Sequence, residues 1–126
     1  MSNCAWQGIR HGFGLLIVIA APALAQTAAN QTVSQAMQAG AREMKAGNFV
    51  QAAAAYAVAT KQRPGFAEAY FNLGLAEEQA GRLEDASADL EKALRLKPGL
   101  RGANLFLGTN DKRQKKYRAA ETHLPE

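Results

Sequence analysis

Few residues of this chain are of a type that performs catalysis, and they lie far apart in the sequence. His123 is the only histidine after Ala25, and Cys4 is the only cysteine. A histidine acts as a general base only within a cleft that supplies it with partner groups. The sequence contains no glycine-rich phosphate-binding loop and no nucleophile elbow. We therefore predict that the protein is not an enzyme and needs no cofactor.

Three acidic residues, Glu43, Glu77 and Asp111, recur at a constant interval and could form a column of carboxylates. A calcium ion needs several oxygen ligands within about 2.6 Å of itself. Side chains on successive stacked helices, about 10 Å apart, do not converge easily on one ion. We therefore expect no metal site here and interpret the three carboxylates as solvated groups close to basic side chains.

The strongest cluster of charge is the segment 112–118, with the sequence KRQKKYR. Basic residues with an aromatic residue among them could contact nucleic acid or another polyanion. The formal net charge of the whole chain is only +4, however, and this segment is expected to cross a helix turn. We therefore interpret the segment as a solvated turn and expect no nucleic acid partner.

Many other residues of the same type are separated by the same interval as the three acidic residues. Glycine, alanine and proline each recur at this interval, and bulky residues fill a further column. The repeated positions are Gly40, Gly74 and Gly108; Ala52, Ala86 and Ala120; Ala59 and Ala93; Pro64 and Pro98; and Tyr56, Leu90 and Leu124. A fixed period of roughly 20 to 50 residues is typical of stacked supersecondary units, each too small to bury its own apolar face. The chain is therefore predicted to be a repeat array.

Helix formers and helix breakers indicate what each unit contains. In the first copy, helices are expected over 33–46 and 49–62, separated by Gly47 and ended by Pro64. The second copy shows the same plan one period later. Each unit is therefore a helix, a tight turn and a second helix, and the predicted fold class is an all-α, helix-turn-helix repeat solenoid.

The third copy begins near Arg101 and is shorter than the others. A turn is expected at Lys115 and Lys116, where lysine replaces the glycine of the other copies. A second helix is expected from Tyr117 and is cut off at Glu126, the last residue. The array thus comprises about two and a half units.

Small residues in the repeated columns allow the helices to approach closely. Glycine at the eighth position of each copy and alanine at the twentieth and twenty-seventh permit helix axes about 8–10 Å apart. The column of aromatic and leucine residues fills the space that remains. We therefore interpret the repeated columns as packing positions.

The segment 1–25 differs in composition from the rest and is predicted to be a signal peptide. Arg10 carries the only charge before an apolar run of about a dozen residues, and Ala23-Leu24-Ala25 provides a pattern for cleavage before Gln26. The alternative is a retained membrane anchor, but a spanning helix needs about 20 apolar residues. Cleavage would also remove Cys4, so the mature protein would have no thiol.

The mature protein is consequently expected to be exported, that is, periplasmic or secreted. Residues 26–32 have no apolar period and are predicted to form a flexible spacer before the first repeat. No stable membrane insertion is expected after cleavage.

The repeated positions resemble those of the tetratricopeptide repeat family, whose unit is a helix-turn-helix of about 34 residues. The family pattern of glycine, alanine, aromatic residue, alanine and proline falls on the columns given above. The resemblance divides the chain into repeat 1 over 33–66, repeat 2 over 67–100 and an incomplete repeat 3 over 101–126. It implies a curved stack whose first helices line a concave groove that binds peptides or protein segments.

The resemblance also implies which residues line the groove, because they come from the second, fifth, ninth and twelfth positions of each first helix. These are Ser34, Met37, Ala41 and Met44; Glu68, Phe71, Leu75 and Glu78; and Gly102, Leu105, Thr109 and Lys112. Methionine among them suits a surface that adapts to several partners.

Some members of the family bind chaperones by clamping a terminal carboxylate with basic and asparagine side chains. The positions that match the clamp are Met37, Ala41, Asn72, Gly102 and Phe106. Only Asn72 is of the required type, so we expect the clamp to be absent and retain Asn72 as a groove residue.

The sequence therefore predicts a non-enzymatic scaffold that binds a protein or peptide partner in its groove. Three alternatives stay open at this point. The chain could be a structural module of a larger envelope complex, it could be a fragment of a longer repeat protein, or it could self-associate through its open third repeat. The groove side chains could also be covered by one another or by a further C-terminal segment.

Overall fold

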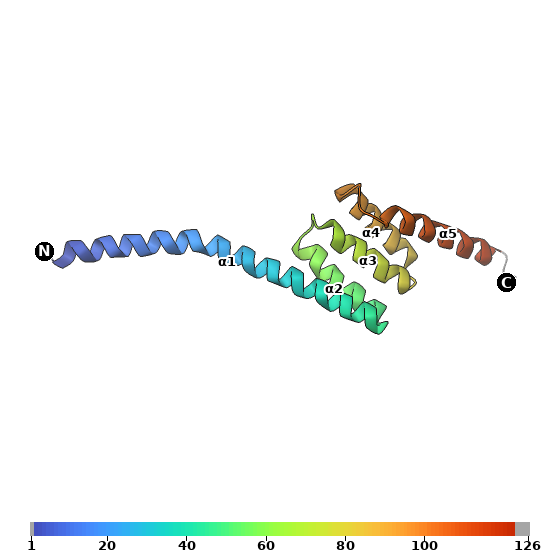
Figure 1. Cartoon of the computed structure of the whole chain (residues 1–126), viewed down its shortest axis with the longest axis horizontal. Helices are drawn as coiled ribbons and strands as arrows, with labels where there is room; N and C mark the ends of the chain where they lie inside the picture. The colour runs from blue at the N-terminus through green and yellow to red at the C-terminus, as the bar shows by residue number, and fades with distance from the viewer. Residues whose placement is uncertain (1, 123–126) are drawn as a thin grey trace. The chain divides into compact units, whose positions relative to one another are not determined.

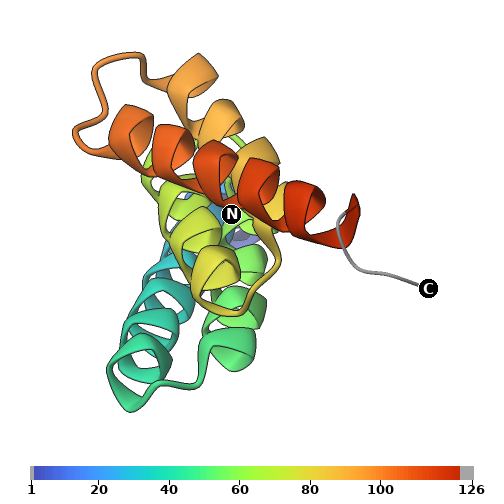
Figure 2. The same cartoon turned by 90° about the vertical axis from the view of Figure 1, so that its right-hand side faces the viewer.

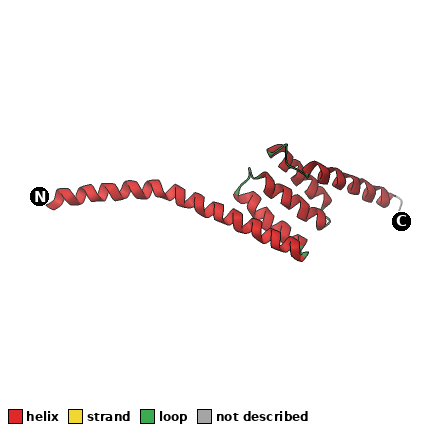
Figure 3. Ribbon diagram, viewed as in Figure 1, coloured by secondary structure: helices red, strands yellow, loops and turns green. Residues whose placement is uncertain are grey.

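A computed structural model describes residues 2–122 of the chain, with side chains described over 24–121. All the secondary structure in this part is α-helical (Figure 3). The helices are α1 (Ser2–Ala46), α2 (Phe49–Gln62), α3 (Ala67–Gln79), α4 (Leu83–Leu96) and α5 (Ala103–Thr122). The predicted all-α class is confirmed, whereas the predictions for His123, Leu124 and the end of the last helix lie outside the described residues.

The chain divides into two compact units, Met1–Thr32 and Val33–Glu126, and α1 contributes to both. Residues 26–32, for which a flexible spacer is predicted, are helical. They contain no glycine or proline that would end the helix, and two of the seven are alanine. Among the described residues, no helix combines the length and the hydropathy that a bilayer crossing requires. Cleavage between Ala25 and Gln26 stays a prediction.

The first helices of the first two repeats end where the sequence predicts, because two glycines make the same turn. Gly47 and Gly81 have φ values of 78° and 82°, in the left-handed region that glycine enters without steric cost. In both turns the amide of the following residue donates to the carbonyl five residues before it. These hydrogen bonds join Asn48 to Glu43 at 2.9 Å and Arg82 to Glu77 at 2.8 Å.

The third copy differs from the prediction, because α5 continues without a break from Ala103 to Thr122 (Figures 1 and 2). The turn predicted at Lys115 and Lys116 is wrong, and Tyr117 lies in the same helix as the residues before it. Lysine is a good helix former and does not favour the left-handed conformation that ends α1 and α3. Within residues 33–122, the array therefore has two complete helix pairs followed by one long helix.

The glycine column marks the closest approach of the two helices within a repeat. A Cβ atom built on Gly40 would lie 2.5 Å from Cε1 of Tyr56, and one built on Gly74 would lie 2.9 Å from Cγ of Leu90. Both distances are too short for a real side chain. A Cβ on Gly108 would meet nothing within 4 Å. The prediction that Gly108 is a packing position is therefore wrong.

The burial of the alanine columns also differs between the first two copies and the third. Ala52, Ala59, Ala86 and Ala93 are fully buried. Ala120 is exposed, because α5 does not turn back at Lys115 and Lys116 and the segment with Ala120 therefore does not pack against the first half of the same helix. The expected packing role of Ala120 is wrong. The regular spacing of the prolines is explained differently, since Pro64 and Pro98 lie exposed in the loops after α2 and α4 and end those helices.

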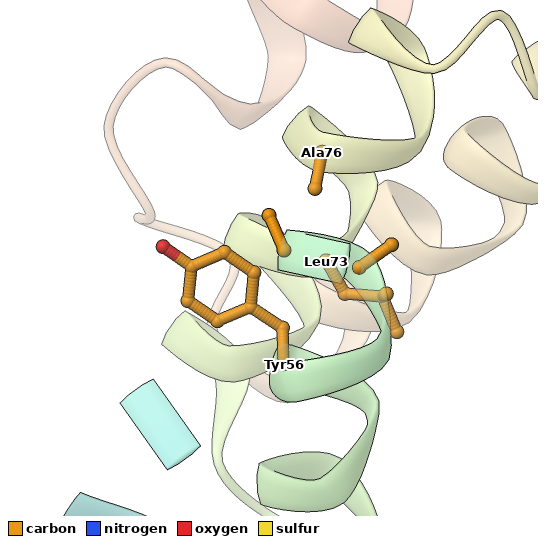
Figure 4. Close-up of a cluster of buried hydrophobic side chains, with 5 residues drawn as sticks. Tyr56, Leu73 and Ala76 are labelled. Carbon is orange, nitrogen blue, oxygen red and sulfur yellow. The ribbon is translucent and has the colours of Figure 1, made fainter. Parts of the chain in front are cut away.

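The core of the first repeat and the next helix is built around one aromatic side chain. Tyr56 of α2 packs with Leu73 and Ala76 of α3, and its hydroxyl points away from both (Figure 4). Met37 and Met44 of α1 also pack against this cluster. Along the array, α3 packs against α2 and α4, and α5 packs against α4.

Candidate binding surface

The predicted groove residues lie on α1, α3 and α5, the first helices of the three copies, except Gly102, which lies in the turn before α5. Met37 and Met44 of α1 share a cluster with Leu73 of α3. Phe71 of α3 contacts Phe106 of α5. We call the surface formed by the residues 33–46 of α1 together with α3 and α5 the first-helix face.

The α1 part of the first-helix face offers little free apolar surface. Met37 and Met44 are partly buried, because they pack against the clusters between α1, α2 and α3. Ser34 and Ala41 are exposed. The two methionines, predicted as an adaptable floor, therefore serve mainly as packing between helices.

Apolar side chains gather where α3 meets α5. The rings of Phe71 and Phe106 meet edge to face, with centroids 5.9 Å apart and an angle of 64° between the ring planes. Gly102, with φ of 83°, lies beside them, since a Cβ there would be 3.6 Å from Cε2 of Phe106. Leu75 is partly exposed one turn after Phe71, and Leu105 is 71 % exposed. This junction is the part of the first-helix face best suited to bind an apolar side chain.

Phe106 and Arg113 of α5 contact residues of α3 on the first-helix face but are not among the predicted groove residues. Phe106 is predicted only as a clamp position, and its contact with Phe71 places it on the first-helix face. Thr109 and Lys112 are exposed as expected, and the Thr109 hydroxyl donates to the carbonyl of Leu105 at 2.9 Å. Thr109 is therefore already hydrogen-bonded within its own helix.

Two carboxylates predicted to line the groove form ion pairs with basic side chains of the same chain. Lys97 Nζ lies 2.6 Å from Glu68 Oε1, and this hydrogen bond holds the pKa of Glu68 below its ordinary value. Arg113 Nη1 lies 2.9 Å from Glu78 Oε1. The side chain of Glu78 is only 6 % exposed, so its expected place in the groove is wrong. Asn72 is partly exposed, as a groove residue would be.

The position of α5 is fixed by polar side chains that the sequence did not reveal. Asn110 is fully buried, and its Nδ2 donates to the Leu83 carbonyl and, at 2.7 Å, to Ser87 Oγ. Gln114 Nε2 donates to the same two oxygens at 3.0 and 2.8 Å. The Ser87 hydroxyl donates in turn to Asp111 Oδ1 at 3.3 Å. One serine of α4 thus takes part in three hydrogen bonds that orient α5.

The three residues of the acidic column, Glu43, Glu77 and Asp111, differ in their surroundings. Within residues 24–121, no group of three potential ligands is placed to hold a metal ion. Glu43 accepts a hydrogen bond of 2.8 Å from Asn48, and Asp111 is exposed. Glu77 is buried beside Asp89 of α4, so its interpretation as a solvated group is wrong.

A cavity of about 380 Å³ lies away from the aromatic junction, between the α3–α4 turn and the second half of α5. Its lining is mixed in charge and consists of Gly81, Leu83, Glu84, Arg113, Gln114, Tyr117, Arg118 and Glu121.

Two of the basic residues in the segment 112–118 form ion pairs within the chain. Arg113 pairs with Glu78, and Arg118 pairs with Glu84 at 3.1 Å. The segment is therefore part of a helix with internal ion pairs and not a solvated turn.

The part of the chain from α1 to α4 matches the sequence model of a known protein family. A model of the tetratricopeptide repeat matches residues 37–101. The chain belongs to the tetratricopeptide repeat family. Repeats of this family are in general non-enzymatic modules for interaction between proteins, which agrees with a described structure built of helix pairs. No curated protein matches the chain significantly.

Solved structures of tetratricopeptide repeat proteins have the same fold. The TPR2B domain of yeast Sti1, solved in a complex with pHsp70, is 24% identical, with a TM-score of 0.66 over 71% of this chain and 72% of that one. MamA from Desulfovibrio magneticus RS-1, from residue 41 to its end, is 26% identical, with a TM-score of 0.61 over 70% of this chain. A double mutant of MamA RS-1 is 25% identical, with a TM-score of 0.63 over 72% of this chain. The tetratricopeptide repeat chain described here spans about half the length of each MamA chain, at 50% and 51%.

Proposed function

We propose that the protein is a scaffold that binds a peptide or an exposed segment of a partner protein on its first-helix face. The observation that carries this proposal is the aromatic junction of α3 and α5. Phe71 and Phe106 hold each other in place there, while Leu105 leaves most of its side chain in water. When a partner covers an exposed apolar group on a face of rigid helices, the free energy of binding becomes more favourable.

The polar groups beside the junction limit how a partner is held. Of the five positions of the carboxylate clamp, Asn72 is present, whereas Met37 and Ala41 cannot bind a carboxylate through a charged group. The glutamates Glu68 and Glu78 are neutralised by Lys97 and Arg113. Recognition through apolar side chains of the partner therefore fits this surface better than capture of a chain terminus.

A pair of charge substitutions tests the proposal. Peptides selected from a displayed library against the full chain are measured for binding by fluorescence anisotropy. Leu105→Glu should weaken binding by about tenfold or more, because it replaces an exposed apolar side chain next to Phe106 with a charged one. Leu105 is so exposed that the substitution leaves the packing of α5 intact.

The matched control is Val50→Glu, because Val50 is 57 % exposed and belongs to α2, a helix that is not part of the first-helix face. This variant should bind as the wild type does. Equal binding by the wild type and Leu105→Glu would place the partner on another surface.

We also propose that the protein is exported, with cleavage between Ala25 and Gln26. The support is the charged start, the apolar run and the small residues that precede Gln26. Intact mass measurement of the protein from the cell envelope and the medium should give a chain that begins at Gln26. A chain that retains the segment 1–25 in all fractions would contradict cleavage.

A further inference from the structure

A buried pair of carboxyl groups joins α3 to α4, outside the proposed binding surface. The residue Glu77 is only 6 % exposed, and its Oε2 is buried without a hydrogen-bond partner. The carboxyl of Asp89, which is partly buried on α4, lies within hydrogen-bonding reach of the same carboxyl. The first repeat has no such pair, because it has Ala55 at the position of Asp89.

Among the described residues, the surroundings of the pair supply little of the positive charge that two buried carboxylates would need. Asp85 of α4 adds a further negative charge, and Arg82, in the turn before α4, opposes it. On the α2 side, the side chains packed against α3 include Tyr56, whose pKa is itself raised by burial. On the α5 side, Arg113 is directed to the neighbouring Glu78. Two carboxylates in contact at such a site cannot both stay charged without a large electrostatic cost.

We propose that Glu77 and Asp89 share one proton across the α3–α4 contact, and that loss of this proton loosens the second repeat. A carboxyl that donates to a carboxylate forms a strong hydrogen bond, whereas two carboxylates repel each other. The helix α3 also carries Phe71 and Leu75 of the first-helix face. The protonation of this pair therefore sets how firmly α3 is held on α4.

The direction of the pH dependence follows from the state of Glu77. Burial raises the pKa of Glu77 to about 8, and the hydrogen bond to Asp89 adds to this effect. Burial also raises the pKa of Asp89. In the unfolded chain a glutamate has a pKa of about 4.3. The folded state thus holds the extra proton, so its stabilising effect is complete below about pH 4.3 and is lost as the pH rises to about 8.

The test is urea unfolding of the full chain between pH 5 and pH 9. For the wild type, the unfolding equilibrium constant should increase as the pH rises to about 8, by up to about tenfold per pH unit. Glu77→Gln should remove most of this increase, because the amide has the shape of the protonated acid and donates to Asp89 without ionising. Glu91→Gln on α4 is the control, since Glu91 is exposed, and should follow the wild type.

Two results would overturn the proposal. One is a wild-type unfolding constant that does not change between pH 5 and pH 8. The other is a Glu77→Gln variant whose unfolding constant changes with pH as much as that of the wild type.

A second measurement on the wild type does not depend on the folding of a variant. Carbon-13 NMR of the glutamate side-chain carboxyls should show one glutamate that titrates with a midpoint above pH 7. In Asp89→Asn that midpoint should shift to lower pH, because the neighbouring negative charge is removed. If every glutamate titrates below pH 6 in the wild type, no proton is shared.

Discussion

At the scale of single residues, the glycines at the eighth position of each copy show how far a sequence column predicts packing. Gly40 and Gly74 face Tyr56 and Leu90 so closely that a Cβ atom would collide with them. Gly108 occupies the same column but faces open space. The column therefore identifies a packing position only where the second helix of the repeat is present.

The substitution Gly74→Ala tests this difference. We expect it to lower the free energy of unfolding by about 1–3 kcal/mol, because the new Cβ would lie 2.9 Å from Leu90 Cγ and 3.2 Å from the Ala86 carbonyl oxygen. Urea unfolding followed by circular dichroism measures the change.

The matched control is Gly108→Ala, which lies in the interior of α5 and meets no neighbour. It should raise the free energy of unfolding by about 0.5–1 kcal/mol, because alanine favours a helix more than glycine does. Equal effects of the two substitutions would show that the register of the second repeat is wrong.

The acidic column shows what a column cannot predict. Glu43, Glu77 and Asp111 share one position of the repeat, which predicts the same solvated state for all three. Among the described residues, only Glu77 has an acidic residue, Asp89, opposite to it on the second helix of its repeat. Whether a carboxylate on a helix points to water or to the next helix depends on packing that the period does not contain. The pairing of Arg113 with Glu78 could not be predicted for the same reason.

At the scale of helices, the boundaries in the first two repeats could be predicted because strong local signals fix them. Gly47 and Gly81 provide the left-handed turns, and Pro64 and Pro98 end the second helices. The third copy lacks such a signal, since Lys115 stands at the position of the two glycines. Extending the period over that position predicts a turn that the structure does not have.

The turn glycine can be tested directly by Gly81→Ala. The φ of 82° is unfavourable for alanine, so the free energy of unfolding should fall by about 1–2 kcal/mol. Gly99→Ala is the comparison, because Gly99 is exposed, has no positive φ and meets no neighbour. Thermal unfolding of both variants should show a loss for Gly81→Ala alone, and a similar loss in both would point to a general effect of glycine replacement in loops.

The contact between α4 and α5 depends on Ser87, whose hydroxyl makes hydrogen bonds with Asn110, Asp111 and Gln114. Ser87→Ala should lower the free energy of unfolding by about 1–3 kcal/mol, because the buried amide of Asn110 and the partly buried amide of Gln114 each lose a hydrogen-bond acceptor. Hydrogen exchange should become faster in α5 than in α2.

Thr109→Ala is the control for Ser87→Ala, since Thr109 is exposed and its hydroxyl donates within its own helix. It should change the free energy of unfolding by less than about 0.5 kcal/mol. If α5 is as well protected in Ser87→Ala as in the wild type, the serine does not orient α5.

At the scale of the whole molecule, the fold and the family could be predicted from the sequence because both depend on the period. The binding surface could be predicted only in part. Leu105, Thr109 and Lys112 are exposed as expected, whereas Glu78 is buried, and Met37 and Met44 are partly buried in packing contacts. Side chains on a first helix face either outward or the neighbouring unit, and the spacing of the repeats does not distinguish these cases.

The central claim is that a partner segment binds on the first-helix face at the junction of α3 and α5. The most direct measurement is amide chemical-shift mapping on the full chain with a selected peptide. The largest shifts should fall on Phe71, Leu75 and Leu105 and on the residues next to them. Shifts confined to the exposed side of α2, around Val50 and Val58, or to the cavity beside Tyr117 would contradict the claim.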